Sequence, residues 1–109
     1  MTRSLQQLVL TTCPDPATAT TVAETLVGER LAACVNILPG VRSVYTWKGR
    51  TETATEQLLI IKSRTDRYAA IQERILALHP YELPEVIAVP IADGLPAYLA
   101  WISNPEDSE

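Results

Sequence analysis

The alternation of apolar and polar residues predicts a strand and then a helix in the first third of the chain. Leu5–Cys13 is rich in leucine, valine and threonine and stops before Pro14, which indicates a buried strand. Asp15 and Pro16 follow, a pair typical of a helix N-cap and first helical position. The predicted helix runs to about Ala32, and its apolar stripe comprises Ala19, Val22, Ala23 and Leu26.

The central third of the chain predicts one long β-hairpin. A β-rich run over Cys34–Leu38 is interrupted at Pro39-Gly40, as a bulge would interrupt it, and resumes over Val41–Trp47. The turn is predicted at Lys48-Gly49-Arg50, and the chain returns through Glu52–Lys62. Both arms exceed the usual strand length of about five or six residues. We therefore expect the outer part of the hairpin to extend beyond the helices.

The last third of the chain predicts a helix, an irregular loop, an edge strand and a short helix. Thr65-Asp66 is expected to cap a helix over Arg67–His79. The segment Pro80–Pro84 must be irregular because a proline stands at each end of it. Glu85–Ile91 is predicted as a strand, and Pro90 places that strand at a sheet edge. The short C-terminal helix contains Tyr98, Leu99, Trp101 and Ile102.

The order of these elements predicts the fold class. It is βαββαβ followed by a short helix, which indicates an α+β, ferredoxin-like antiparallel sheet with both long helices on one face. No internal boundary divides the 109 residues, so we expect a single domain over residues 1–109. Residues 1–6 and 104–109 are expected to be flexible ends of this domain.

Composition and charge narrow the classes of function. Hydrophobic residues make up 47% of the chain and charged residues 20%, which is typical of a globular protein. The formal net charge is −4 and the basic residues are scattered, so no nucleic-acid partner is expected. No apolar run reaches signal-peptide length at the N-terminus or the roughly 20 residues of a membrane span. We therefore expect a cytoplasmic protein with no membrane partner.

Three blocks of the sequence carry a resemblance to a known family. They are Arg30–Asn36, the alternating positions Ser43, Tyr45, Trp47 and Gly49, and the run His79–Glu82 with Pro84 and Glu85. In their order and spacing they resemble the CutA family of divalent-cation tolerance proteins, over nearly the whole chain. The resemblance implies a ferredoxin-like fold, a tight homotrimer and a role in tolerance of divalent cations, copper especially. It also implies a likeness to PII-type signalling proteins, trimers that bind small ligands between subunits.

The chain has few side chains that could bind copper or zinc. Protein sites for copper or zinc use three or four nitrogen or sulfur ligands, which one histidine and two cysteines struggle to supply. The resemblance implies a cysteine near the end of the first strand and a second histidine, at positions that hold Thr11 and Leu78 here. His79 is the metal candidate that remains, and Cys13, on the same strand face as Thr11, is its suggested companion. The alternative for His79 is a helix C-terminal histidine that the helix dipole favours.

A second set of polar residues is a candidate lining for a ligand cleft. Glu82 and Glu85 lie in the proline-flanked loop beside Tyr81, and rigid loops of this kind often carry binding sites. Glu56 and Lys62 stand where the resembled family has recurrent residues. Carboxylate oxygens suit a hard cation. The alternative is that these carboxylates bind backbone amides or pair with arginine and lysine.

The remaining candidates favour assembly over catalysis. Large rings often anchor protein interfaces, so Tyr45, Trp47 and Trp101 are expected in the trimer interface. Cys34 is expected to be a small buried hydrophobe, and a nucleophilic pair with His79 would need an adjacency that the sequence does not supply. No CxxC, Ser-His-Asp order, HExxH or Walker pattern is present, so no enzyme is predicted.

The sequence thus predicts a homotrimeric divalent-cation tolerance protein of the CutA type that binds Cu²⁺ or another divalent cation weakly. No organic cofactor is expected. The alternative function is a PII-like sensor that binds a small molecule in clefts between subunits. The physiological ligand, any other protein partner and the redox state of Cys13 and Cys34 stay open at this stage.

Overall fold

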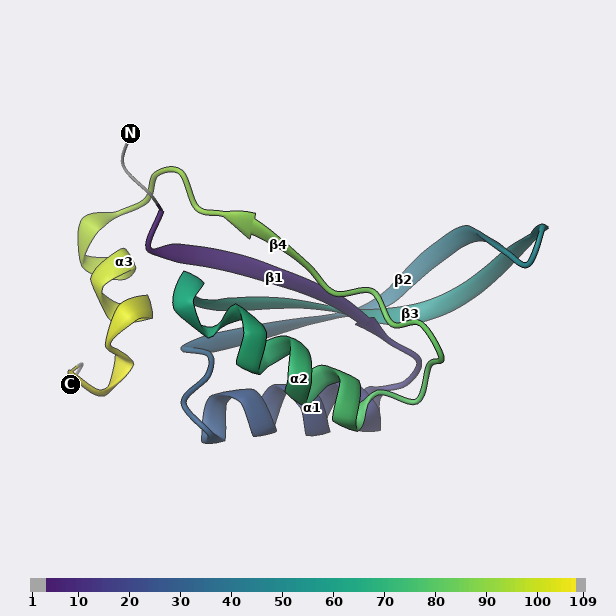
Figure 1. Cartoon of the computed structure of the whole chain (residues 1–109), viewed down its shortest axis with the longest axis horizontal. Coiled ribbons are helices and arrows are strands. Elements are labelled where there is room, and N and C mark those ends of the chain that lie inside the picture. The colour runs from purple at the N-terminus through teal and green to yellow at the C-terminus, as the bar shows by residue number, and fades with distance from the viewer. Residues whose placement is uncertain (1–3, 108–109) are drawn as a thin grey trace.

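The protein is an antiparallel sheet with two long helices on one of its faces (Figure 1). The computed structural model describes residues 4–107. Its elements, in chain order, are β1 (Gln6–Cys13), α1 (Pro16–Gly28), β2 (Cys34–Trp47), β3 (Arg50–Arg64), the 3-10 helix η1 (Thr65–Arg67), α2 (Tyr68–Leu78), β4 (Ile87–Pro90), α3 (Pro96–Ser103) and the 3-10 helix η2 (Pro105–Asp107). The predicted βαββαβ order with a short C-terminal helix is confirmed.

The strands of the described chain pair in the order β2-β3-β1-β4, and every pairing is antiparallel. This order places β4 at an edge of the sheet, as the position of Pro90 predicted. Both α1 and α2 lie against the same face of the sheet (Figure 1). The predicted ferredoxin-like α+β fold is therefore confirmed.

The core lies between the sheet and these two helices. Successive side chains point to opposite faces of a strand, so residues directly paired across strands share a face. Val9 is paired with Ile61 and Thr11 with Leu59, and all four side chains are fully buried under the helices. Helix α1 contributes its predicted apolar stripe, with fully buried Ala19, Val22 and Leu26, and α2 contributes fully buried Ile71 and Ile75. Each large aliphatic side chain contributes on the order of 1.5–3 kcal/mol by its burial.

The other face of the sheet is also apolar, and we call it the open face. Leu10 is paired with Ile60 on β3 and with Ile87 on β4, so these three side chains point away from α1 and α2. The same register argument adds Leu8, Leu38, Leu58 and Val89 to this face. Ile87 is 50% exposed, and the residues nearer the middle of the sheet are half-buried. The open face thus presents aliphatic side chains to solvent.

Within residues 4–107, one end of the open face carries a helix, α3. The side-chain amide of Gln6 donates to the Ser103 hydroxyl at 3.0 Å, and the Lys62 ammonium donates to the Tyr98 hydroxyl at 3.3 Å. Gln6 and Lys62 lie at the end of the sheet that is remote from the hairpin tip (Figure 1). α3 therefore leaves the opposite end of the open face, nearer the hairpin, uncovered.

Strands β2 and β3 form the predicted long hairpin, whose outer part extends away from the helices (Figure 1). The strand register shifts between Leu38 and Val41, and Gly40 has a φ of +72°. This irregularity is the bulge that Pro39-Gly40 predicted. The hairpin gives the chain its elongated shape, 45 × 32 × 23 Å along the principal axes.

Helix α1 ends at Gly28, four residues before the predicted end at Ala32. Arg30 adopts a left-handed φ of +62°, which ends the helix. The amides of Leu31 and Ala32 then donate to the Leu26 carbonyl, 2.9 and 3.2 Å away. Leu31 and Ala32 still pack on the core, so the apolar pattern continues past the true end of the helix.

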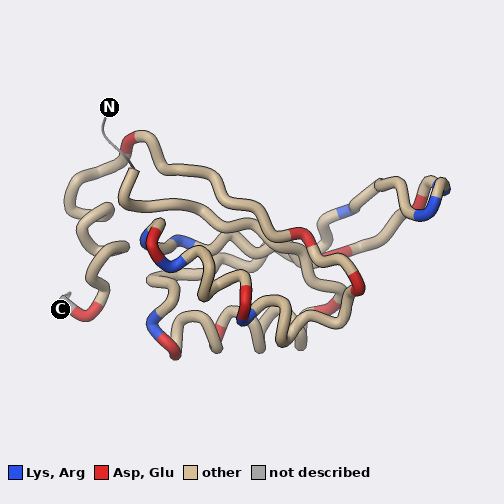
Figure 2. The backbone as a smooth tube through the Cα atoms, viewed as in Figure 1, with Lys and Arg blue, Asp and Glu red and all other residues tan. Residues whose placement is uncertain are grey.

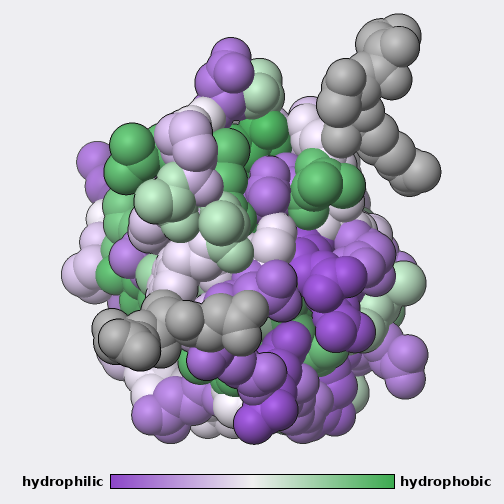
Figure 3. All heavy atoms as spheres, turned by 90° about the vertical axis from the view of Figure 1, so that its left-hand side faces the viewer, coloured by the Kyte–Doolittle hydropathy of each residue, from purple (hydrophilic) through white to green (hydrophobic). Residues whose placement is uncertain are grey.

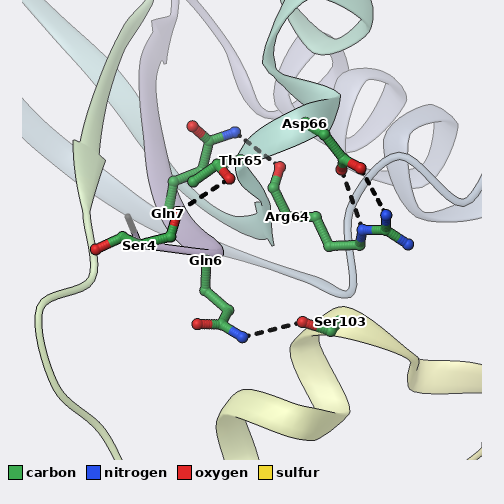
Figure 4. Close-up of polar contacts among 7 residues, drawn as sticks. All are labelled: Ser4, Gln6, Gln7, Arg64, Thr65, Asp66 and Ser103. Carbon is green, nitrogen blue, oxygen red and sulfur yellow. Dashed lines mark hydrogen bonds and ion pairs between the residues drawn. The ribbon is translucent and has the colours of Figure 1, made fainter. Parts of the chain in front are cut away.

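Helix α2 begins at Tyr68, after η1, and the predicted Thr65-Asp66 cap is wrong. Figure 4 shows why. The Asp66 carboxylate accepts two hydrogen bonds from the Arg64 guanidinium, at 3.0 and 2.5 Å, and the Thr65 hydroxyl donates to the Ser4 carbonyl at 3.1 Å. Both side chains are therefore held by partners outside the helix.

The last strand differs in extent from the expectation, and the structure describes part of each end of the domain. Strand β4 covers Ile87–Pro90 instead of Glu85–Ile91, although the Ile91 amide still donates to the Gln6 carbonyl at 3.0 Å. Residues 4–6 and 104–107 have defined positions in strand, helix or hydrogen-bonded turn. Residues 1–3 and 108–109 lie outside the described residues, and the flexibility of the ends stays a prediction.

Candidate functional site

The His79 ring lies buried where α2 ends, and the backbone occupies both of its nitrogens. Nδ1 accepts a hydrogen bond from the Tyr81 amide at 3.2 Å. Nε2 therefore carries the proton and donates to the Thr12 carbonyl oxygen at 2.6 Å. The ring thus ties the loop after α2 to the end of β1. A metal could bind His79 only after one of these hydrogen bonds is broken.

Cys13 is fully buried on the helix-covered face, the same face as Thr11. Burial, together with the negative charges of Asp15 and Glu56, raises the pKa of the Cys13 thiol to about 11. Metals bind the thiolate, which a raised pKa disfavours. The surroundings of Cys13 are those of a small core hydrophobe. Its role as a metal ligand stays a prediction that this environment does not favour.

Glu56, Tyr81 and Glu85 meet where the hairpin leaves the body of the molecule, and we call them the acidic cluster. The Glu56 side chain is buried, and its Oε2 accepts a hydrogen bond from the Tyr81 hydroxyl at 2.7 Å. Partial desolvation, and then the nearby Glu56 carboxylate, raise the pKa values of half-buried Tyr81 and of Glu85, which is still exposed to solvent. Figure 2 shows acidic segments gathered in this region. The structure therefore brings together three of the five predicted cleft residues.

The other two cleft candidates, Lys62 and Glu82, are not members of the acidic cluster. Lys62 is six residues from Glu56 along β3, which is about 20 Å at the usual rise of a strand. Its ammonium lies 5.6 Å from the centre of the Tyr98 ring, which in turn lies 5.5 Å from the Trp101 ring. Glu82 is exposed in the loop. Within one subunit, Lys62 is therefore far from the acidic cluster.

The family model described as CutA1 divalent ion tolerance protein matches residues 7–105. The chain belongs to this family. It is 47% identical over 98 residues to the divalent-cation tolerance protein CutA of Thermus thermophilus, which covers 90% of this chain and 95% of that protein. The family assignment made from the three sequence blocks is confirmed.

Solved CutA structures share the fold. The divalent cation tolerance protein from Thermus thermophilus superimposes with a TM-score of 0.89 at 46% identity, covering 91% of this chain and 96% of that chain. CutA from Xylella fastidiosa gives a TM-score of 0.90 at 48% identity, covering 96% of this chain and all of that chain.

The CutA family is described by divalent-cation tolerance and not by a catalysed reaction. Its members occupy more than one compartment. The Oryza sativa relative, 45% identical over 97 residues, is named chloroplastic, and this chain covers 55% of its length. The Archaeoglobus fulgidus CutA is named periplasmic. In the described part of this chain, none of the helices has the length and apolar character needed to cross a membrane.

The aromatic residues expected in a CutA interface lie at two places. Tyr45 is exposed on the outer hairpin, and the nearby half-buried Trp47 ring has the Lys48 ammonium 5.8 Å from its centre. Trp101 lies on α3, with its ring against Tyr98. Sequence reasoning did not select Tyr98 as a site residue. Its spacing of three from Trp101 was the available signal, because residues three apart lie on one side of a helix.

Cys34 and Cys13 lie on opposite faces of the sheet. Cys34 is paired with Lys62 and points to the open face, whereas Cys13 is paired with Gln57 and points to the helices. Both cysteines are free thiols in the structure. His79 contacts the end of β1 next to Cys13, so the structure does not bring Cys34 and His79 together.

Proposed function

We propose that the protein acts in divalent-cation tolerance as a homotrimer that assembles through its open face and hairpin. The observation that carries this proposal is the open face itself. Its aliphatic side chains extend across β1, β2, β3 and β4, and those of Leu38, Ile87 and Val89 are at least 40% exposed. Contiguous apolar surface of this kind marks an interaction site. A second copy of the chain is the partner that the family resemblance implies.

The strand edges support a closed ring of subunits. The described sheet ends at β2 on one side and at β4 on the other, and both strands leave backbone groups unpaired along their outer edges. Natural proteins cover such edges, and cyclic assembly is the common way to do so in an oligomer. The outer hairpin adds the exposed rings and aliphatic groups of Tyr45 and Val44. The threefold symmetry comes from the resemblance.

We propose weak binding of a divalent cation at the acidic cluster. Within residues 4–107, no three histidine, cysteine, aspartate or glutamate residues lie close enough to hold a metal ion. The nitrogens of His79 and the thiol of Cys13 do not fit Cu²⁺ as they stand, because they are hydrogen-bonded or protonated. The carboxylates of Glu56 and Glu85 supply two oxygen donors. Further ligands would have to be waters or groups from a second subunit.

A PII-like sensor role is the second candidate function. Lys62, Tyr98 and Trp101 form a cationic and aromatic group at the far end of the open face from the acidic cluster. Such a group suits a small anionic or aromatic ligand. In a ring of subunits this group would lie near a neighbouring chain, which is where an intersubunit cleft would form. Both candidate functions are binding roles, and we propose no catalysed reaction. The proposed compartment is the cytoplasm.

Calorimetric titration with Cu²⁺ and with Mn²⁺ tests the metal proposal. Binding in the micromolar range or weaker is expected, with at least a tenfold loss in Glu85→Gln, because one of two charged donors is removed. Glu82→Gln, a neighbouring carboxylate in the same loop, is the matched control and should bind as the wild type does. Binding that survives Glu85→Gln and is lost in His79→Gln would return the site to the histidine and overturn the acidic cluster.

A further inference from the structure

A pocket of about 580 Å³ lies at the end of the molecule remote from the hairpin, away from the acidic cluster. The segment after α1, the end of β3, η1 and the C-terminal segment form its walls. Leu31 and Ile102 supply apolar surface, and Arg30, Arg64 and Arg67 supply guanidinium groups. Figure 3 looks onto this end of the molecule, where hydrophilic and apolar side chains lie next to each other.

The charge of the pocket is opposite to that of the chain. The chain carries a net charge of −4, yet the described lining residues include three arginines and one carboxylate, that of Glu106. Arg64 is paired with Asp66, whereas Arg67 affects Asp66 only through its charge. Guanidinium groups bind carboxylates and phosphates through paired hydrogen bonds. The pocket therefore favours an anion.

One anion is already present in the pocket, and it belongs to the chain. The Glu106 carboxylate lies 2.5 Å from Nη1 of Arg30, which shows that a carboxylate fits there. The pair is largely exposed, with side-chain exposures of 77% for Arg30 and 57% for Glu106. Exposed ion pairs contribute little to stability. Glu106 is thus held weakly enough for another anion to displace it.

The backbone of Arg30 is a second, independent feature of the site. Its φ of +62° lies in the left-handed region, where helices normally end in glycine or asparagine. A bulky residue there costs stability, and such outliers cluster at functional sites. The conformation places the Arg30 side chain at the pocket, where a glycine would supply no charge.

We propose that this pocket binds a small organic anion with a carboxylate or phosphate group, and that Glu106 occupies its place in the free chain. The charged group of the ligand would pair with Arg30 and Arg67. Its carbon skeleton would contact Leu31 and Ile102. Binding would release the C-terminal segment that carries Glu106, because the two anions compete for the same guanidinium.

Calorimetry with citrate and with inorganic phosphate at constant ionic strength tests this proposal. Citrate should bind in the millimolar range, at least threefold more tightly to Glu106→Gln, which lacks the competing charge, and about tenfold more weakly to Arg67→Gln. Citrate should bind more tightly than phosphate because of its contacts with Leu31 and Ile102, and comparable binding would overturn the assignment of an organic anion. Arg42→Gln, an exposed hairpin arginine outside the pocket, is the control and should leave both affinities unchanged.

Two further results would overturn the proposal. The first is the absence of citrate and phosphate binding to both the wild type and Glu106→Gln. The second is binding that Arg67→Gln and Arg42→Gln weaken equally, since that would reflect net charge alone. An affinity that does not change in Glu106→Gln would remove the place-holding role of that carboxylate. Melting temperatures of all variants, measured without ligand, separate lost binding from lost folding.

Discussion

Thr11 carries a hydroxyl group into the core of the protein. Its side chain is fully buried between β1 and the helices, and its Oγ1 has no hydrogen-bond partner in the described structure. An unsatisfied buried hydroxyl costs about 1–3 kcal/mol. The Thr11 hydroxyl therefore lowers the folding stability of the domain.

Replacing Thr11 by valine should stabilise the protein. The substitution keeps the branched shape and removes the unsatisfied hydroxyl, so the free energy of unfolding should rise by about 1–2 kcal/mol. Urea denaturation measures the change. Thr20→Val, at an exposed position of α1, is the matched control and should change stability by less than about 0.5 kcal/mol. A less stable Thr11→Val variant would contradict the assignment.

Glu85 predicts a pH dependence of stability. Partial desolvation and the Glu56 carboxylate raise the pKa of the exposed Glu85 side chain above its ordinary value of 4.5, so the folded state binds this proton more tightly than the unfolded state does. Stability should therefore fall as pH rises from 4.5 through the folded pKa, where the carboxylate becomes ionised. Glu85→Gln removes this charge.

The expected result is a higher melting temperature for Glu85→Gln than for the wild type at pH 7, and a smaller difference at pH 4. Thermal denaturation at both pH values is the measurement. Glu82→Gln, three residues earlier in the same loop, is the control for the loss of one negative charge. A larger advantage of Glu85→Gln at pH 4 than at pH 7 would show that the sign is wrong.

Sequence reasoning at the residue scale identified side chains but not their partners. His79 was chosen because imidazole binds metals, yet its ring is held by the Thr12 carbonyl and the Tyr81 amide. Backbone groups are present at every position, so no residue pattern could reveal which of them would meet the ring. The grouping of Glu56 with Tyr81 is different, because both stood at positions that the family resemblance had marked.

At the scale of elements, the hairpin and the helix order could be predicted because they depend on local signals. Pro39-Gly40 marked the bulge, and alternation marked both arms of the hairpin. The end of α1 could not be located, since Leu31 and Ala32 continue the apolar pattern while the backbone reverses at Arg30. The cap of α2 failed because Asp66 bonds to Arg64 instead of the helix. The ends of the helices therefore depend on tertiary contacts, which the apolar pattern of the sequence does not reveal.

The hairpin tip offers a test of local backbone preference. Trp47 pairs with Arg50, so the loop has two residues, Lys48 at φ +50° and Gly49 at φ +78°. Two positive φ values define a type I′ turn, which favours Asn-Gly. Lys48→Asn should therefore stabilise the protein by about 0.5–1 kcal/mol, and Gly49→Ala should destabilise it by about 1 kcal/mol.

Chemical denaturation of both tip variants measures these effects. Gly28→Ala is the contrasting glycine substitution, because Gly28 ends α1 without a positive φ and has open space where the alanine Cβ would stand. It should be neutral or stabilising. Equal destabilisation by Gly49→Ala and Gly28→Ala would show that the turn conformation is not the cause.

At the scale of the whole molecule, the single chain leaves its apolar surface and its candidate site incomplete. The open face is aliphatic on strands β1, β3 and β4, and the acidic cluster supplies two carboxylates but no third metal ligand among the described residues. Lys62 lies about 20 Å from Glu56 along one strand. A neighbouring subunit would cover the open face and could supply the missing metal ligands.

The most direct test of assembly into a homotrimer is the mass of the native protein, measured by native mass spectrometry and sedimentation at micromolar concentration. We predict one dominant species of three times 12.0 kDa. Ile60→Glu, in the middle of the open face, and the double variant Tyr45→Ala/Trp47→Ala on the hairpin should shift this species toward the monomer. Val27→Glu, an exposed apolar position on the helix side, should leave it unchanged. A folded wild-type monomer at this concentration would contradict trimer formation. A trimer that Ile60→Glu leaves intact would contradict assembly through the open face.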